Sequence, residues 1–205
     1  MFEFKPLLLL CFVTLTLNAA GSRPYMGLSF EGGYGFITQD NSAADVPDID
    51  VNPILYGAKL NVGIDSGEDL RTNIYFGLDY VDEDIYGYTD NTNKELGSSH
   101  QLLYSVGFDI VKTYSTKGSS VLPYLRAGMD YGWMPLQGYA QSWANNVGFT
   151  VGGGTFLSMG SAELQLGVYY KYRLWGNYNL DTYETQNVDL SDHSVLLELG
   201  MNFYY

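Results

Sequence analysis

Residues 191–205 read SDHSVLLELGMNFYY and alternate between apolar and mixed positions up to the last residue. One face of this segment carries Val195, Leu197, Leu199, Met201, Phe203 and Tyr205. Successive side chains leave a β-strand on opposite sides, so a period of two predicts a strand with one apolar face. A frayed terminus would gain nothing from so regular a pattern, and we expect this strand to be docked in a sheet.

Seven further segments repeat the period of two, at 24–37, 53–65, 70–81, 99–112, 121–133, 147–159 and 162–175. The connections between them alternate in length. Long polar stretches lie at 38–52, 82–98, 134–146 and 176–191, and the short turns are SGED, TYSTKGS and Gly160–Ser161. An up-and-down antiparallel sheet whose long loops all lie at one end produces this rhythm. The length of 205 residues fits a single all-β domain.

The charged residues of these segments fall on the face opposite the apolar one. They are Glu31, Lys59, Arg71, Asp79, Asp109, Arg126, Asp130, Glu163, Lys171, Arg173 and Glu198. In a soluble lipocalin-like barrel this face would meet water, and the apolar face would enclose a ligand. In a membrane barrel the arrangement is inverted, with lipid outside and polar groups inside.

The heights of the aromatic residues favour the membrane barrel. Near the long-loop end the apolar face carries Tyr34, Phe36, Tyr56, Tyr80, Tyr104, Tyr131, Trp133, Phe149, Tyr170 and Tyr172. Aliphatic residues occupy the middle of the same face. Amphipathic rings at interface height with aliphatic residues between them are typical of a membrane girdle. We therefore predict an all-β fold, an eight-stranded antiparallel up-and-down transmembrane β-barrel over residues 21–205, whose last strand pairs with the first so that no edge meets lipid.

The first twenty residues have the organisation of a cleaved secretory signal peptide. MFEFK precedes the apolar run LLLLCFVTLTL, and the small residues NAAGS follow. We expect cleavage after Ala20 or one or two residues later. The single cysteine, Cys11, lies within the apolar run, so the predicted mature chain has no cysteine and no disulfide.

The segments YMGLSFEGGYGF, LPYLRAGMDYGW and LQLGVYYKYRLW resemble the first, fifth and seventh strands of the small eight-stranded outer-membrane barrels. That superfamily includes the OmpA transmembrane domain, the OmpX/Ail adhesins and the opacity-type surface antigens. The resemblance covers the mature chain and implies a Gram-negative outer-membrane location. The ending, with Phe203 and Tyr205, also resembles the terminal signal that the outer-membrane assembly machinery recognises in its clients.

An eight-stranded barrel is just wide enough for side chains to fill it. We therefore expect the interior charges to form a paired plug, and the protein to be a monomeric surface protein, structural or adhesive, without a cofactor. A narrow porin-like channel is the alternative. We expect the partners to be outer-membrane lipid and lipopolysaccharide, the assembly machinery, and host or matrix surfaces that contact the loops. The net charge of −13, much of it in the loops, disfavours nucleic acid.

The third long loop, MPLQGYAQSWANN, is uncharged and carries Tyr139 and Trp143, which are either candidate binding contacts or rings packed onto the neighbouring rim of the barrel. An enzyme is the rival class, because some outer-membrane barrels modify lipid A. The histidines of the chain are His100 and His193, and Ser191 shares the face of His193. Because no acid is clearly placed to orient the imidazole, we expect no enzymatic activity and no catalytic or metal site.

Overall fold

The computed structural model describes residues 21–41, 49–67, 69–82, 101–115, 119–135, 143–176, 178–179 and 187–205. The predicted signal peptide at 1–20 lies outside these ranges. Within them the chain forms one antiparallel sheet. Its strands are β1 (Arg23–Asn41), β2 (Ile49–Val51), β3 (Ile54–Asp65), β4 (Leu70–Val81), β5 (Gln101–Thr113), β6 (Val121–Pro135), β7 (Trp143–Met159), β8 (Ala162–Trp175), β9 (Tyr178–Asn179) and β10 (Asn187–Tyr204).

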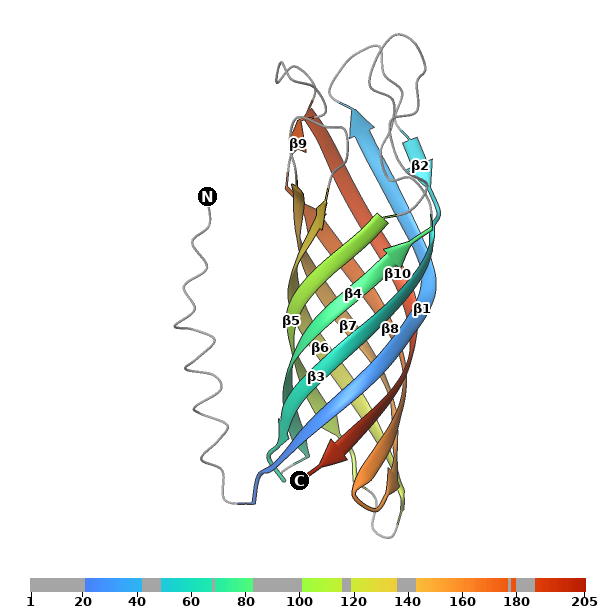
Figure 1. Ribbon diagram of the computed structural model, residues 1–205. Coiled ribbons are helices and arrows are strands. Elements are labelled where there is room, and N and C mark those ends of the chain that lie inside the picture. The colour runs from blue at the N-terminus through green and yellow to red at the C-terminus, as the bar shows by residue number, and fades with distance from the viewer. Residues whose placement is uncertain are drawn as a thin grey trace.

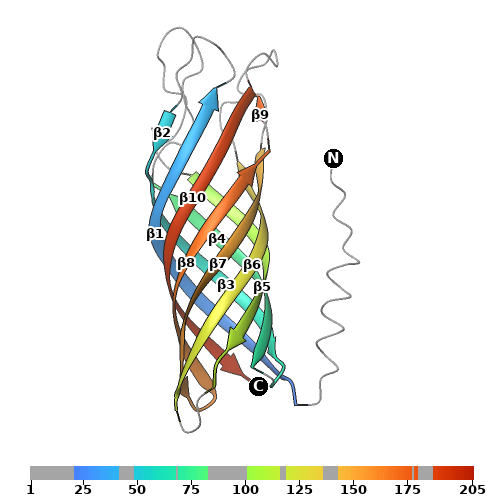
Figure 2. The same ribbon diagram turned by 180° about the vertical axis from the view of Figure 1, so that it is seen from behind.

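Eight of these strands are long, and each pairs with its neighbour in the chain in the order β1-β3-β4-β5-β6-β7-β8-β10. The pairing of β10 with β1 closes the ring, as both views of the ribbon show (Figures 1 and 2). The short strand β2 pairs with the end of β1 at residues 37–39, and the short strand β9 pairs with the start of β10 at residues 187–188. The predicted fold, a closed eight-stranded antiparallel barrel, is confirmed. Among the described residues no helix is long and apolar enough to cross a membrane.

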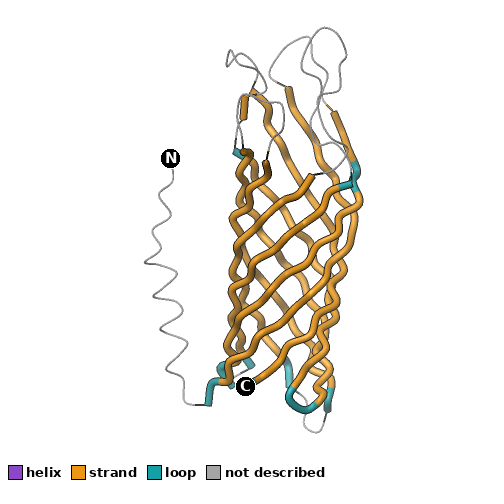
Figure 3. The backbone as a smooth tube through the Cα atoms, in the orientation of Figure 1, coloured by secondary structure: helices purple, strands orange, loops and turns teal. Residues whose placement is uncertain are grey.

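The register of the pairings determines the tilt of the strands. Following paired residues once around the barrel from Pro123 on β6 leads through β7, β8, β10, β1, β3, β4 and β5 back to Trp133 on β6. The path therefore rises by 133 − 123 = 10 residues per turn. With a rise of about 3.3 Å per residue and a strand spacing of about 4.8 Å, this stagger tilts the strands by about 40° from the barrel axis. The inclined strands are visible in the backbone trace (Figure 3).

The strands reach further into three of the four predicted long loops than the sequence indicated. β1 continues to Asn41, β6 to Pro135, and β10 begins at Asn187. The predicted loops 38–52, 134–146 and 176–191 are shorter because β1 and β10 pair with each other up to Asn41, and β6 with β7 up to Trp143. Continued pairing satisfies backbone N–H and C=O groups that a loop would leave to water. The loop predicted at 82–98 lies outside the described residues apart from Asp82.

The barrel is inverted relative to a soluble protein. Its outer face carries exposed Leu, Val, Phe and Met side chains, among them Leu197 at 63% and Phe30 at 57% exposure. Its interior holds the buried charges together with many glycines. Gly152, opposite Arg126 on the neighbouring strand, is one of them: a Cβ there would collide with Tyr169. Inward glycines thus leave the space into which the large interior side chains extend.

Candidate functional site

All eleven charged side chains predicted for the interior are buried in the lumen. Two more carboxylates join them, from Asp65 and Asp192. Both lie in phase with the polar face of their strands, so the alternation of the sequence was sufficient to find them. The buried charges form three groups along the barrel, which we name the turn-end, middle and loop-side clusters.

The turn-end cluster consists of Asp65, Arg71, Glu163 and Tyr204. Arg71 binds Glu163 through two contacts, Nη1 to Oε2 at 2.6 Å and Nη2 to Oε1 at 3.3 Å. Its Nε lies 3.4 Å from Asp65 Oδ2, and the Tyr204 hydroxyl donates to Glu163 Oε2 at 2.8 Å. β4 and β8 lie four strands apart in the ring, so the bidentate pair crosses the lumen.

The middle cluster is built around Arg126. Its Nη2 lies 2.7 Å from Asp109 Oδ2 and its Nη1 lies 2.6 Å from Glu198 Oε2, which also accepts a hydrogen bond from Gln165 at 2.6 Å. Arg126 therefore links β6 to its neighbour β5 and, across the lumen, to β10. A cavity of only about 10 Å³ lies beside it, enough for about one water molecule.

A second ion pair in the middle cluster joins Lys59 to Glu31. The ammonium group of Lys59 lies between two tyrosine rings, 5.0 Å from the centre of Tyr75 and 4.9 Å from that of Tyr169. The Tyr169 hydroxyl donates to Glu31 Oε2 at 2.7 Å. The carboxylate and the ammonium are thus both satisfied without water, as burial requires.

The loop-side cluster alternates cations and carboxylates. Lys171 Nζ lies 2.9 Å from Asp130 Oδ2, and Arg173 bridges Asp79 and Asp192 at 2.9 Å each. The Tyr75 hydroxyl donates to Asp130 at 2.8 Å. In the described part of the chain, each of the five buried Lys and Arg side chains thus lies within 4 Å of at least one carboxylate.

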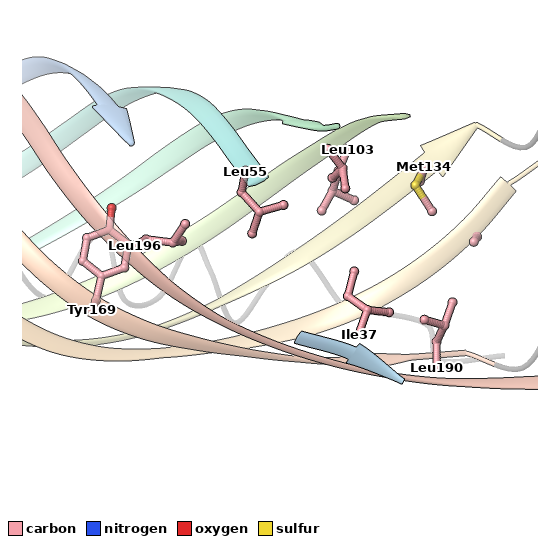
Figure 4. Packing of buried hydrophobic residues seen from close by; sticks show 9 residues of the cluster. Ile37, Leu55, Leu103, Met134, Tyr169, Leu190 and Leu196 are labelled. Atoms are coloured by element: carbon pink, nitrogen blue, oxygen red, sulfur yellow. The ribbon is translucent and has the colours of Figure 1, made fainter. Parts of the chain in front are cut away.

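Apolar side chains fill the lumen beyond the charges, toward the long loops. This apolar layer, which the sequence analysis did not identify, consists of Ile37, Leu55, Val81, Leu103, Met134, Ala144 and Leu190, with Val51 and Trp175 packed against it; Tyr169 and Leu196 belong to the same buried cluster. Figure 4 shows its members extending from several strands toward one another. Each lies in the inward phase of its strand near the loop end. Apolar residues at the inward-facing positions near the loop ends of the strands were therefore the signal from which the sequence could have predicted this layer.

The ten predicted girdle residues lie on the outer face, exposed or partly exposed. Several rings contact each other along this band: Tyr104 stacks on Trp133 at 6.1 Å, and Tyr34 meets Phe36 edge-on at 5.4 Å. At the opposite end Phe203 is 50% exposed and Tyr205 73% exposed. Of the candidate loop contacts, Tyr139 lies outside the described residues. Trp143 is the first residue of β7, paired with Pro135, so its assignment to a loop was wrong.

Among the described residues, Asp192 and His193 point to opposite faces of β10 and cannot form a triad within that strand. The His193 ring is on the outer face, where its Nδ1 hydrogen-bonds the Tyr170 hydroxyl and its ring lies 4.7 Å from that of Tyr172. Asp192 points into the lumen and binds Arg173. His100 lies outside the described residues. In the part of the chain that the structure describes, no group of three metal-ligating side chains is assembled.

The fold resembles that of proteins of known structure. Neither a protein-family model nor a curated protein matches this sequence. Among solved structures, neisserial surface protein A is similar with a TM-score of 0.52 at 18% identity, over 87% of this chain and 97% of that one. The N-terminal barrel of Pseudomonas aeruginosa OprF has a TM-score of 0.40 at 16% identity, over 85% of this chain and 97% of that one. The Yersinia pestis attachment invasion locus protein Ail has a TM-score of 0.37 at 16% identity, over 86% of this chain and 98% of that one. The first of these likenesses shows that the chain has the fold of the small outer-membrane barrels.

Proposed function

We propose that this chain is a surface protein of a Gram-negative outer membrane, structural or adhesive, that presents four extracellular loops on a closed, side-chain-filled barrel. The observation that carries the proposal is the inverted barrel: among the described residues, thirteen charged side chains are buried inside and an apolar band is exposed outside. A soluble barrel would gain nothing from exposing that band to water, whereas a bilayer requires it.

The location follows from the same argument. A closed barrel leaves no unpaired strand edge in hydrocarbon, and the outward aromatic residues suit the interface between lipid and water. Export through a cleaved signal peptide at 1–20, and insertion by the assembly machinery through the ending with Phe203 and Tyr205, belong to this proposal. Its lipid partners are the outer-membrane phospholipids and lipopolysaccharide around the barrel, which we take to be a monomer.

The filled lumen favours a structural or adhesive role over a channel. Three charged clusters and the apolar layer occupy the interior, and an apolar layer repels hydrated ions. The surface available to partners is then the loop end, where host or matrix molecules would bind. On the outer face His193 hydrogen-bonds the Tyr170 hydroxyl and packs against the Tyr172 ring.

An epitope-tag experiment tests the orientation. A tag inserted between Gly138 and Tyr139 lies in the predicted extracellular connection of β6 and β7, whereas the matched control tag lies in the Gly160–Ser161 turn at the other end. Antibody should label intact cells carrying the first tag and should label the second only after permeabilisation. The opposite pattern, or equal labelling, would refute the orientation.

Loop replacement tests the adhesive role. Residues 42–48, 83–100, 136–142 and 180–186 are each replaced by Gly-Ser segments of equal length, and binding of the cells to matrix-coated surfaces is measured. At least one replacement should reduce binding while the barrel remains in the membrane. Unchanged binding in all four variants would leave the structural role and exclude the adhesive one.

A further inference from the structure

We propose that the outer face of the barrel carries a seat for one lipid acyl chain, across β7, β8, β10 and β1. The inference rests on the proposed membrane insertion and goes beyond it, because it predicts preferential binding at one place on the barrel circumference. A shallow groove of about 600 Å³ lies there, and its surface is predominantly apolar.

The registers account for the shape of the groove. Its floor is one row of paired residues whose side chains point inward: Glu31, Glu198, Gly167 and Gly154. The outward row on one side is Phe30, Leu199, Leu166 and Thr155, and that on the other side is Gly32, Leu197, Val168 and Gly153. Because the second row has a glycine at each end, its Leu–Val pair is flanked by two gaps where the outer face falls to the level of the backbone.

The chemistry of the lining selects hydrocarbon. The outward side chains are aliphatic or aromatic except for the hydroxyl of Thr155, and the carboxylates of Glu31 and Glu198 are buried on the lumen side. A gap in contact with hydrocarbon loses dispersion contacts unless atoms fill it. A flexible acyl chain can follow a narrow groove across four strands. A second barrel would need roughly 800 Å² of matching surface on each partner. The Leu197 and Phe30 side chains protrude at the borders of this groove and would keep a second barrel wall away from its floor.

One glycine of the groove, Gly32, can be replaced by a larger residue without a steric clash. At Gly32 a Cβ would have its nearest neighbour at 3.8 Å, the Leu55 carbonyl oxygen, which is ordinary van der Waals contact. At Gly153 a Cβ would lie 2.7 Å from the Tyr124 carbonyl oxygen, so substitution there would strain the backbone. Gly32→Leu should therefore occupy one end of the groove without disturbing the barrel. Ala127→Leu is the control, since it adds three side-chain carbons, one fewer than Gly32→Leu, to the outer face of β6, on the strand next to β7 and outside the lining of the groove.

The test uses photo-crosslinking. The barrel is folded into vesicles of phosphatidylethanolamine and phosphatidylglycerol that contain a phospholipid with a diazirine in its acyl chain. Adducts are mapped by peptide mass spectrometry. Lipid adducts at Phe30, Leu166 and Leu197 should exceed those at the outward residues Phe76 and Val106 on the far wall by about threefold, the ratio that a few additional carbon–carbon contacts produce. Gly32→Leu should remove this excess, and Ala127→Leu should leave it unchanged.

Two results would overturn the seat: an even distribution of lipid adducts around the barrel, or fewer lipid adducts at Leu197 than at Phe76 and Val106, as expected if a second copy of the chain covers the groove. Failure of the proposed function has a different signature. A chain that does not insert would give no lipid adducts at Phe76 and Val106 either. In a detergent gel its unboiled sample would also not migrate faster than its boiled sample, as a folded barrel does.

Discussion

Glu31 and Glu198 lie directly opposite each other on β1 and β10, at the seam where the barrel closes. Like charges opposite each other across two strands destabilise a sheet, and burial strengthens their repulsion. Each carboxylate has its own cation: Lys59, from the strand next to β1, binds Glu31, and Arg126, from across the lumen, binds Glu198. The two carboxylates that meet at the seam are thus balanced by cations from β3 and β6, which no local pattern at the seam reveals.

Removing Lys59 should weaken the barrel strongly. Lys59→Met leaves the Glu31 carboxylate buried and facing Glu198, and breaking a buried ion pair costs about 3 kcal/mol or more. The free energy of unfolding in urea, measured on barrels refolded into vesicles, gives the value. Arg23→Met is the control, because Arg23 is 63% exposed and its contact with Asp65 contributes at most about 1 kcal/mol. The double variant Glu31→Gln/Lys59→Met should regain part of the loss; equal costs for Lys59→Met and Arg23→Met would contradict the assignment.

Adjacent tyrosines on β8 provide a second comparison. The Tyr169 hydroxyl donates to the buried Glu31 carboxylate, and the Tyr170 hydroxyl contacts His193 on the outer face. Tyr169→Phe should lower the free energy of unfolding by about 2 kcal/mol, since it removes a buried hydrogen bond to a charged group. Tyr170→Phe should change it much less. The same urea titration measures both, and the reverse order would mean that the inward and outward faces of β8 are exchanged.

Two methionines on β6 test the apolar layer. Met134 is fully buried in the lumen and Met129 is 44% exposed on the outer face. Met134→Ala should cost about 2–5 kcal/mol because it leaves a cavity among Leu103, Ala144 and their neighbours. Met129→Ala should cost less, because lipid closes around the shortened side chain. Similar unfolding free energies for the two variants would show that the layer is not packed.

The lumen should not conduct. In planar bilayers the purified barrel is expected to show no large, stable open events, because ion pairs span the lumen and the apolar layer lies above them. A triple variant with Leu55, Leu103 and Met134 changed to Gly should show more frequent brief events than the wild type. Large, steady openings of the wild-type barrel would favour the narrow channel instead.

The sequence predicts the faces of this barrel well and their contacts poorly. Alternation alone assigns Arg71 and Glu163 to the interior, because side-chain direction depends only on parity along a strand. It cannot show that these two residues pair across the lumen, since that depends on a stagger of ten residues that accumulates over eight registers. The apolar layer was missed for a related reason: Met134 and Ala144 were assigned to a loop, although they continue the inward phase of their strands.

The most direct test of the central claim is the electrophoretic mobility of the protein from a fractionated cell envelope, with and without boiling in detergent. An inverted, ion-paired barrel should be found in the outer-membrane fraction and should migrate faster unboiled than boiled, because the closed barrel resists detergent until it is heated. Lys59→Met should lose the compact band at a lower temperature than the wild type. A soluble periplasmic protein without a shift would contradict the account, and the apolar face would then have to line a ligand cavity.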